Sequence, residues 1–418
     1  MNKQVSHIPS GYKPSPLGII PEDWEVKRLG EVGEVFSGGT PNTEIQEYWN
    51  GNIDWCTPTD ITLLNGAVYI ERTALKITDL GLKSSSAVLL PPNSIIVCTR
   101  ATIGNAAISL HQIATNQGFK NIVPNENIDT LFLYYTIVNN KIRLIRLGNG
   151  STFLEVSKSD FENLTIPVPP LPEQRRIVSV LSLWDTAIAK QTALIEKLTL
   201  RKRGLMQQLL TGKKRLKGFG GEWKEVRLGE IGVFFKGGGV PKDKITNFGN
   251  KCLTYGDLYT KYDFVISDVK SYIDDHTANE SVKIRYGDIC FAGSGETKED
   301  IGKCAAFIDN EYGYAGGDII VFRANDCNPI TLSYILNSSD VIRQKSNMGQ
   351  GHSVVHIYPY QLEKLLIKLP SRAEQDAIAT ILMESDKEIE IQKQKLAAMQ
   401  AQKKGLMQVL LTGKRRVK

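Results

Sequence analysis

The sequence predicts an α+β protein made of two similar mixed α/β domains, each followed by a long helix. The two helices are expected to pair as an antiparallel coiled coil with pseudo-two-fold symmetry. Three observations predict this fold. The chain repeats itself after about 200 residues, the interior of each repeat has the composition of short strands and turns, and each repeat ends in an unbroken heptad pattern.

The edges of the two repeats are very similar. GLMQQLLTGK at 204–213 and GLMQVLLTGK at 405–414 agree at nine of ten positions, at an offset of 201. Trp24 and Trp223 head segments that end in RLGEVGEVFSGG and RLGEIGVFFKGG, at an offset of 199. The chain therefore contains two copies of one unit of about 200 residues.

The interiors of the repeats, 42–147 and 241–348, agree only in scattered places. This difference favours two modules that bind different targets, although drift after an old duplication would leave the same pattern. Runs such as SIIVCT, FKNIVP and DIIVFRA, separated by Gly, Pro, Asn and Asp, predict short strands and loops. Short helices are expected at 129–147 and 330–345.

Each repeat ends in a heptad pattern in which the spacing of the seam positions alternates between four and three residues. Pro172 and Glu173 suit a first helical turn, Ser371-x-x-Glu374 matches a capping box, and both helices should end at a Thr-Gly pair. The seam of the first repeat recurs 201 residues later and consists of Ile177, Leu181, Trp184, Ile188, Gln191, Ile195, Leu198, Lys202, Leu205 and Leu209.

The polar seam residues predict the direction and register of pairing. A parallel pair would place Lys202 against Lys403, whereas an antiparallel register in which partner numbers add to 594 matches Gln191 with Lys403 and Gln392 with Lys202. An antiparallel pair should hold the two domains at opposite ends of a spacer. The alternative is that each helix packs only on its own domain.

Composition excludes several classes of protein. The 418 residues have a formal net charge of +6, which permits a polyanionic partner without requiring one. No run of 18 apolar residues is present, and the N-terminal segment lacks the apolar stretch of a signal peptide. Six scattered cysteines indicate reduced thiols, so a cytoplasmic protein without membrane contact is expected.

The duplicated unit resembles the specificity subunit of type I restriction–modification enzymes. The resemblance rests on PLPEQRRIVSVL at 170–181, on the paired Leu-Thr-Gly-Lys helix ends and, more weakly, on SGGTP at 37–41 and TNQGF at 115–119, and it covers essentially the whole chain. The second repeat departs from it, with SRAEQ at 371–375 and AGGDI at 315–319.

The resemblance implies a division into 1–165 and 216–369 as target-recognition domains and 166–215 and 370–418 as repeated helical regions. Each recognition domain would read one half of a split, asymmetric site in double-stranded DNA. The helices would set the half-site spacing and dock two methyltransferase (modification) subunits, which restriction subunits with translocase and nuclease activity would join. S-adenosylmethionine, ATP and Mg would belong to those partner subunits, whose complex would methylate adenine at N6 or cleave unmethylated DNA.

Motifs for chemistry in this chain itself are missing. GSGETK at 293–298 lacks P-loop spacing, no Asn/Asp-Pro-Pro-aromatic motif of adenine methyltransferases is present, and His352 and His356 lack a third metal ligand. A non-catalytic chain without a metal site is therefore predicted. Two alternatives remain: a coiled-coil scaffold with no DNA role, and a stand-alone methyltransferase with its own target domain.

Candidate DNA-contacting residues are polar or basic side chains in loops and at strand ends, because these groups contact phosphates and base edges. In the first repeat they are Ser37, Gly38, Gly39, Thr40, Thr99, Arg100, Thr102, Asn116, Gln117, Lys120, Arg143, Arg146, Ser151 and Thr152. In the second they are Lys236, Lys242, Lys244, Lys298, Arg323, Arg343, Lys345, Gln350 and His352. The basic residues after each helix suit either phosphate contact or the negative end of the helix dipole.

Overall fold

The computed structural model describes residues 8–148, 154–240, 242–351 and 354–417. Its contacts divide the chain into two compact units, Met1–Thr192 with Gln394–Lys418 (unit 1) and Ala193–Lys393 (unit 2). Each unit therefore contains the start of one long helix and the end of the other. Among the described residues, none of the helices is both long and apolar enough to span a membrane.

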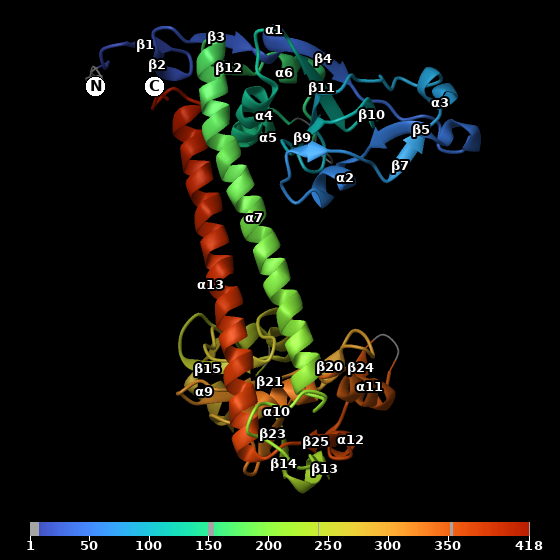
Figure 1. The fold of residues 1–418 in the computed structure, drawn as a ribbon, viewed down its shortest axis with the longest axis vertical. Helices are drawn as coiled ribbons and strands as arrows, with labels where there is room; N and C mark the ends of the chain where they lie inside the picture. Colours follow the sequence, from blue (N-terminus) through green and yellow to red (C-terminus); the bar gives the residue numbers. More distant parts are fainter. Residues whose placement is uncertain (1–7, 149–153, 241, 352–353, 418) are drawn as a thin grey trace. The chain divides into compact units, whose positions relative to one another are not determined.

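Unit 1 is built around a mixed five-stranded sheet in the order β4-β11-β8-β9-β6, with a three-stranded sheet β10-β5-β7 beside it (Figure 1). Two further strand pairs, β1-β2 and β3-β12, complete the unit. The strands are β1 Tyr12–Ser15, β2 Gly18–Pro21, β3 Glu25–Arg28, β4 Gly33–Ser37, β5 Trp49–Cys56, β6 Tyr69–Ile70, β7 Leu75–Ile77, β8 Ile95–Cys98, β9 Ala106–Ser109, β10 Ile113–Thr115, β11 Phe119–Pro124 and β12 Thr165–Val168.

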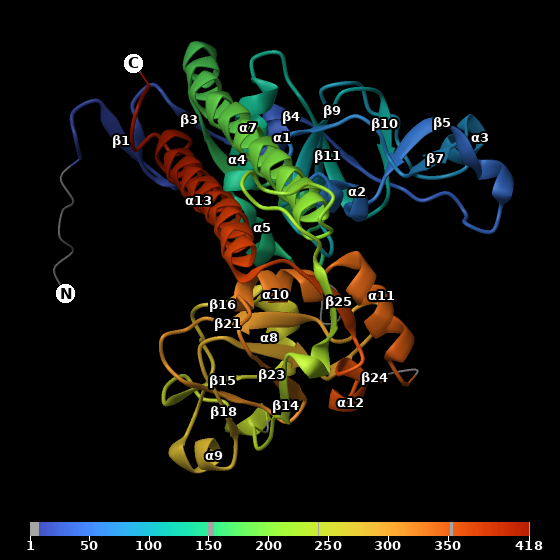
Figure 2. The ribbon, with the colours of Figure 1, turned by 60° about the horizontal axis from the view of Figure 1, so that its bottom comes forward.

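The helices of unit 1 are short except for the terminal one. α4 packs on β9 of the five-stranded sheet. It also lies beside α7 (Figure 2). The helices are α1 Leu29–Val32, η1 Gln46–Tyr48, α2 Pro58–Leu63, α3 Asp79–Lys83, α4 Thr130–Asn139, α5 Lys141–Leu147, α6 Lys158–Glu162 and α7 Leu171–Leu209, which continues into unit 2. The helix expected at 129–147 is thus two helices, α4 and α5.

Unit 2 repeats this plan. Its five-stranded sheet has the order β14-β23-β19-β21-β16, and a four-stranded sheet has the order β17-β15-β22-β18; β13-β25 and β20-β24 are two-stranded. The strands are β13 Lys224–Arg227, β14 Gly232–Lys236, β15 Asn250–Leu253, β16 Val265–Ile266, β17 Tyr272–Ile273, β18 Val282–Ile284, β19 Asp288–Ala292, β20 Ser294–Gly295, β21 Cys304–Phe307, β22 Gly313–Ala315, β23 Ile319–Ala324, β24 Val355–His356 and β25 Leu366–Leu369.

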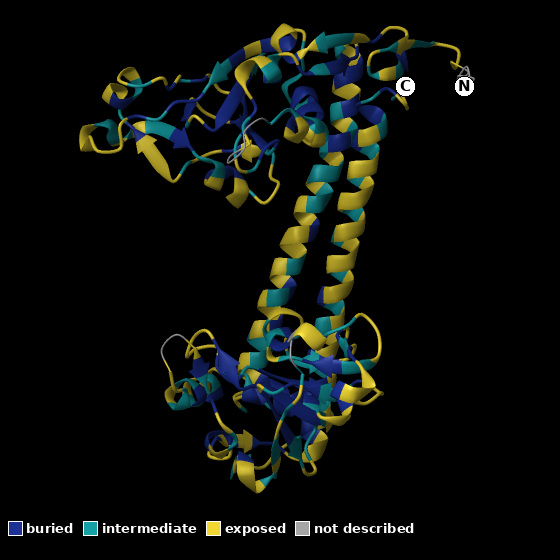
Figure 3. Cartoon of the chain, turned by 180° about the vertical axis from the view of Figure 1, so that it is seen from behind, coloured by how far each residue is buried: buried dark blue, intermediate teal, exposed yellow. Residues whose placement is uncertain are grey.

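In unit 2, α10 packs on β21 as α4 packs on β9 in unit 1. The helices are η2 Leu228–Glu230, η3 Lys242–Lys244, α8 Tyr255–Thr260, α9 Asp275–Asn279, α10 Pro329–Leu336, α11 Ser339–Met348, α12 Pro359–Leu362 and α13 Arg372–Leu410, which continues into unit 1. Buried residues, dark blue in Figure 3, concentrate in the strands of each main sheet. The α+β fold with two repeated domains is confirmed.

The main core of each unit includes the end of the other repeat's helix. Met407, Leu410 and Leu411 of the second repeat are buried with Ile177 and Leu181 in unit 1. Leu209 and Leu210 of the first repeat are buried with Ile378 and Leu382 in unit 2. The alternative that each helix packs only on its own domain is therefore wrong.

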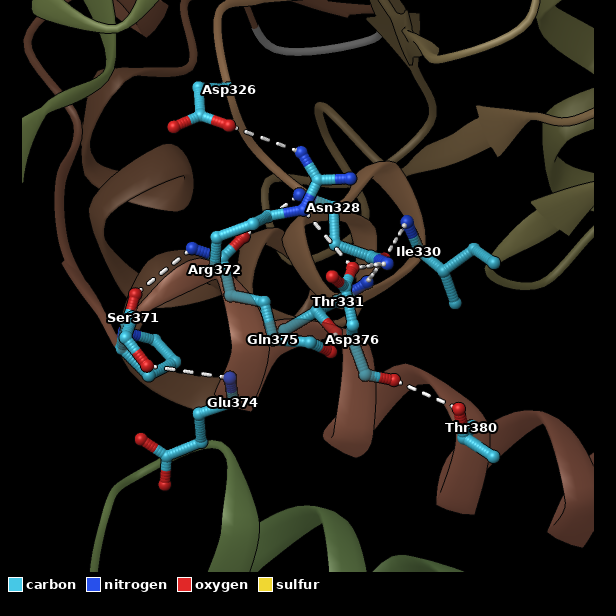
Figure 4. A network of polar contacts seen from close by, with 11 residues as sticks. Asp326, Asn328, Ile330, Thr331, Ser371, Arg372, Glu374, Gln375, Asp376 and Thr380 are labelled. Atoms are coloured by element: carbon cyan, nitrogen blue, oxygen red, sulfur yellow. Dashed lines mark hydrogen bonds and ion pairs between the residues drawn. The ribbon is translucent and has the colours of Figure 1, made fainter. Parts of the chain in front are cut away.

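The start of each long helix is tied to the globular part by its Glu-Gln pair. The side chain of Gln375 accepts a hydrogen bond from the Asn328 N–H and donates to the Pro370 carbonyl (Figure 4). Gln174 makes the same two contacts with Asp129 and Pro169. Because Asp129 and Asn328 are the N-caps of α4 and α10, each glutamine joins two helix starts.

The glutamates beside these glutamines have a different role from the one predicted. Ser371 accepts a 3.4 Å hydrogen bond from the Glu374 N–H, but the Glu374 carboxylate is held by Arg215 at 2.8 and 2.7 Å rather than completing a capping box. Arg416 holds the Glu173 carboxylate in the same way, at 3.1 and 2.6 Å. These two arginines, in the basic segments after the helices, thus form nearly identical ion pairs in the two units.

The helices run antiparallel in each unit, but their register differs from the predicted one. Lys403 contacts Asp185 in unit 1 and Lys202 contacts Asp386 in unit 2, so partner numbers add to 588 rather than 594. The predicted matches of Lys403 with Gln191 and Lys202 with Gln392 are therefore wrong by nearly one heptad. The heptad pattern permits both registers, and the aspartates, which lie next to the seam, make the observed one favourable. Gln191 and Gln392 have other partners within the chain.

Candidate nucleic-acid interface

Three predicted loops of unit 1 meet at one end of its main sheet. The Gly38 N–H donates to the Phe119 carbonyl at 3.2 Å, and the Gly39 N–H donates to the Thr115 carbonyl at 2.9 Å. The Thr99 N–H donates to the Gly118 carbonyl at 2.8 Å. The residues after β4, after β8 and between β10 and β11 therefore form one polar loop cluster, which contains eight of the fourteen residues predicted for this repeat; Ser37 and Lys120 lie in the adjoining ends of β4 and β11.

The glycines of this cluster are required by close backbone approach. A Cβ atom on Gly38 would lie 1.8 Å from the Asn116 carbonyl oxygen, and one on Gly39 would lie 2.2 Å from the Ala87 nitrogen. Neither space can hold a side chain without a backbone shift. Gly38 and Gly39 therefore allow the loops of the cluster to approach one another closely, and a ligand could contact them through backbone atoms alone.

Two cations of the cluster pair with Glu155, a residue that is not among the predicted DNA contacts. Its carboxylate binds the Arg100 guanidinium at 2.6 Å and the Lys120 ammonium at 3.3 Å. Burial raises the pKa of Glu155, but the hydrogen bond from Arg100 and the charges of both cations outweigh it and lower the pKa. Two cations share one anion, so the group keeps a positive charge at neutral pH.

A cavity of about 970 Å³ opens beside this group. It is lined by Arg100, Thr102, Asn105, Lys141 and Glu155 together with Ile145 and Leu154, which are apolar. Asn116 and Gln117 lie nearby in the same cluster, where Gln117 contacts Thr40 and Asn116 accepts from the Gly118 N–H. The cluster therefore combines amide, hydroxyl and guanidinium groups of the kinds that contact base edges and phosphates.

Unit 2 has the same loop frame with different side chains. The Gly237 N–H donates to the Ile319 carbonyl, Gly238 to Ala315, and Gly293 to Asp318, which repeats the three bonds of unit 1. Where unit 1 has Asn116 and Gln117, unit 2 has Gly316 and Gly317. The segment between β19 and β21, which includes β20, is also longer than the segment between β8 and β9. The two units therefore share the backbone hydrogen bonds of these loops but differ in the side chains that the loops carry.

The Arg100–Glu155 pair has a serine–histidine counterpart in unit 2. The Val156 N–H donates to the Thr99 carbonyl, and in unit 2 the Ile357 N–H donates to the Gly293 carbonyl. The adjoining residues Ser294 and His356 therefore occupy the places of Arg100 and Glu155, and their side chains are hydrogen-bonded at 3.0 Å. When the two repeats are aligned at an offset of 201 residues, Glu155 pairs with His356. This pairing is the feature of the sequence that could have pointed to Glu155.

Several residues predicted to contact DNA have partners inside their own unit. Arg143 donates to the Thr165 carbonyl at 2.8 Å, and Arg323 pairs with Asp288 through two 2.8 Å bonds. Lys345 is buried, and its ammonium donates to the Gly302 carbonyl at 2.6 Å. Burial of Lys345 lowers its pKa. A contact of Lys345 with DNA stays a prediction; in this structure its side chain does not reach the surface.

Two further predicted residues are also buried. Thr99 is 1% exposed and its hydroxyl donates to the Gly118 carbonyl. Lys120 is 6% exposed and engages Glu155. Direct DNA contacts of these two residues stay predictions; in this structure both residues support the loop cluster from within.

The remaining predicted residues are on the surface or outside the described part of the chain. Arg343 forms an exposed ion pair with Asp340. The other exposed ones, whose DNA contacts stay predictions, are Arg146, Lys236, Lys244, Lys298 and Gln350. Outside the described residues, or with an undescribed side chain, lie Ser151, Thr152, His352 and Lys242.

Comparison with known proteins agrees with this duplicated architecture. A family model described as "Type I restriction modification DNA specificity domain" matches residues 21–200 and again residues 220–401. The two matches together cover most of the chain and correspond to the two repeats.

Similar curated proteins and solved structures also come from type I restriction–modification systems. The MjaVIII specificity subunit of Methanocaldococcus jannaschii is 26% identical over 414 residues, 96% of this chain and 94% of the relative. The MjaIX specificity subunit of that organism is 38% identical over 194 residues, but the match spans only 45% of each chain. The S subunit from M. genitalium has the same fold, with a TM-score of 0.54 at 16% identity over 93% of this chain and 96% of that one. A chain from a structure of type I R-M complex assembly reaches a TM-score of 0.62 at 20% identity, over 95% and 99% of the two chains.

Proposed function

Because the chain belongs to the family of type I restriction–modification DNA specificity domains, we propose that it is the sequence-recognition subunit of such a complex. Unit 1 and unit 2 each read one half of a split, asymmetric site in double-stranded DNA. The chain itself is not catalytic.

The observation that carries this proposal is the repeated loop frame with unlike side chains. The same backbone hydrogen bonds present Arg100, Asn116 and Gln117 in unit 1, where unit 2 has Ser294, Gly316 and Gly317. Direct readout depends on which donors and acceptors enter the groove. Two copies of one frame with different groups are therefore suited to two different half-sites.

We further propose that the paired helices set the half-site spacing and dock two modification subunits, which restriction subunits join. α7 and α13 each have 39 residues, or about 58 Å at 1.5 Å per residue. Cofactor chemistry belongs to those partners, which would use S-adenosylmethionine, ATP and Mg. Adenine methylation at N6 and cleavage are activities of the assembled complex.

The experiment that tests the proposal is a genome-wide map of methylated adenines in cells that express the chain with and without its modification subunit. We expect a new two-part, asymmetric motif that is present only when both proteins are expressed. No new motif beside an active modification subunit would reject the proposal. Binding of S-adenosylmethionine by the purified chain alone would favour the stand-alone methyltransferase instead.

A further inference from the structure

Arg100 lies in the turn between β8 and β9, which two backbone hydrogen bonds hold in place. The Thr102 N–H donates to the Arg100 carbonyl at 2.6 Å, and the Gly104 N–H donates to the Cys98 carbonyl at 2.9 Å. Ala101, between them, has a φ of +54°, a conformation that a non-glycine residue adopts only when its surroundings impose it. The backbone of Arg100 is therefore held in place before any ligand arrives.

The guanidinium of Arg100 is also held, but only on one side. Its Nη2 lies 2.6 Å from Glu155 Oε2, and the other carboxylate oxygen contacts Lys120 Nζ at 3.3 Å. The Arg100 side chain keeps 42% of its surface exposed, against 7% for Lys120. Among the described residues, Glu155 is the partner of the guanidinium, so several of its five N–H donors remain available.

This arrangement differs from that of the other arginines predicted to contact DNA. Arg143 and Arg323 use their guanidinium groups on carbonyl and carboxylate oxygens within their units. Arg343 is exposed, but it pairs with Asp340 three residues away on the surface of α11. Arg100 combines an exposed guanidinium with a rigid base and a fixed partner, which is what a group that reads a base requires.

The second repeat indicates that this position varies with the target. Ser294 occupies the place of Arg100 but is 3% exposed, and its hydroxyl is bonded to His356. A position that keeps its backbone frame while its side chain changes from an exposed cation to a buried hydroxyl is suited to specificity rather than to folding.

We propose that Arg100 is a base-reading residue of unit 1 that recognises a guanine, and that Glu155 is its positioning residue. An arginine reads guanine by donating two parallel hydrogen bonds to O6 and N7 in the major groove. Glu155 holds one Nη atom of the guanidinium, and Lys120 holds Glu155. The proposal rests on the proposed function, since it assumes that unit 1 binds duplex DNA.

The test is selection of bound duplexes from a randomised pool by the chain assembled with its modification subunits. In R100Q we expect the preference for guanine at one position of one half-site to fall at least about fivefold, because a bidentate pair is worth about 1–3 kcal/mol. The other half-site should stay unchanged. R285Q, which removes an exposed arginine of unit 2 that is not among the predicted DNA contacts, is the matched control and should leave the whole motif intact.

Salt dependence separates a base contact from a phosphate contact. If Arg100 contacts a phosphate, R100Q will weaken binding to all duplexes alike and reduce the salt slope by about one, with the motif unchanged. That result, or an unaltered motif at unaltered affinity, overturns the proposal. If the wild-type complex selects no two-part motif, the proposed function fails instead. Equal unfolding temperatures of R100Q and wild type exclude misfolding.

E155Q tests the role of Glu155, and R100K tests whether Arg100 acts through a bidentate contact. E155Q removes a negative charge near DNA, so overall affinity should rise while the guanine preference falls, a combination that a merely structural role does not produce. R100K keeps the charge but cannot form the bidentate pair, so it should retain affinity and lose discrimination. E155Q with unchanged discrimination would remove Glu155 from the proposal.

Discussion

Lys403 and Lys202 lie 201 residues apart at the same heptad position, and each contacts an aspartate and an aromatic ring. Lys403 contacts Asp185 and lies 4.9 Å from the ring centre of Tyr135. Lys202 contacts Asp386 and lies 5.0 Å from that of Tyr334. Both tyrosine hydroxyls donate to the same aspartates, so a cation inside the seam is compensated on two sides.

The cysteines provide a prediction at the scale of single residues. Burial raises the pKa of Cys98, Cys252 and Cys304 to about 11, and the thiols of Cys56 and Cys290 are shifted upward for the same reason. At pH 8 these thiols remain protonated, so a thiol-specific disulfide reagent should label them only when the chain opens.

Cys327, which is partly exposed, should therefore react first. The measurement is the time course of labelling at pH 8, with C327S as the control that should remove the fast phase. Fast labelling of several cysteines in the native chain would contradict the buried positions.

At the scale of elements, each long helix ends in a loop that pairs with the start of the other helix. Gly212 and Gly413 take φ values of +68° and +71°, which ends the helices at the predicted Thr-Gly pairs. The arginines that follow bind Glu374 and Glu173, whose side chains are only 1% and 2% exposed. A buried carboxylate without its partner is costly, so these ion pairs fasten the helix ends.

R416Q should therefore loosen the end of α13 in unit 1. It leaves the buried Glu173 without its guanidinium, although the Trp24 indole N–H still donates to it at 3.0 Å. We expect the free energy of unfolding of this helix end to fall by about 2 kcal/mol. The loss is smaller than for a fully buried ion pair because Arg416 is partly exposed. The measurement is amide hydrogen exchange of 405–417, with the exposed neighbour Arg415→Gln as the control. Equal exchange in both variants would contradict this role.

At the scale of the whole molecule, two units are each completed by a segment from the other repeat. Unit 1 combines Met1–Thr192 with Gln394–Lys418, and unit 2 is the continuous segment Ala193–Lys393, so the boundaries between the units fall within the two long helices. This exchange places both long helices in both units. We expect the length of the helix pair, rather than either unit, to govern the spacing of the DNA half-sites.

Insertion of one heptad into both helices, after Thr192 and after Lys393, tests this expectation. Seven residues add about 10 Å of helix, which corresponds to about three base pairs. The unspecified spacer of the target should lengthen by that amount with both half-sites unchanged, as read from the methylation motif. A change in the half-sites themselves would show that the helices are not a simple spacer.

The sequence by itself determined the duplication, the α+β class, both long helices with their ends, and the three polar loops of the first repeat. These features depend on local pattern: side-chain periodicity, glycine at close approaches and the likeness of the two copies. The register of the helix pair was wrong because a heptad seam is compatible with shifts of seven residues. Only the aspartates beside the seam and the aromatic rings of each unit decide between the registers.

Tertiary structure alone decided which basic residues are available to a ligand. Lys120, Arg143, Arg323 and Lys345 look like surface cations in the sequence, but folding places a carboxylate or carbonyl oxygen against each of them. Partners of this kind lie 22 to 43 residues away, too far for any local pattern to indicate. Arg100 is distinguished from them because, in the part of the chain that the structure describes, Glu155 is its one carboxylate partner and its side chain stays 42% exposed.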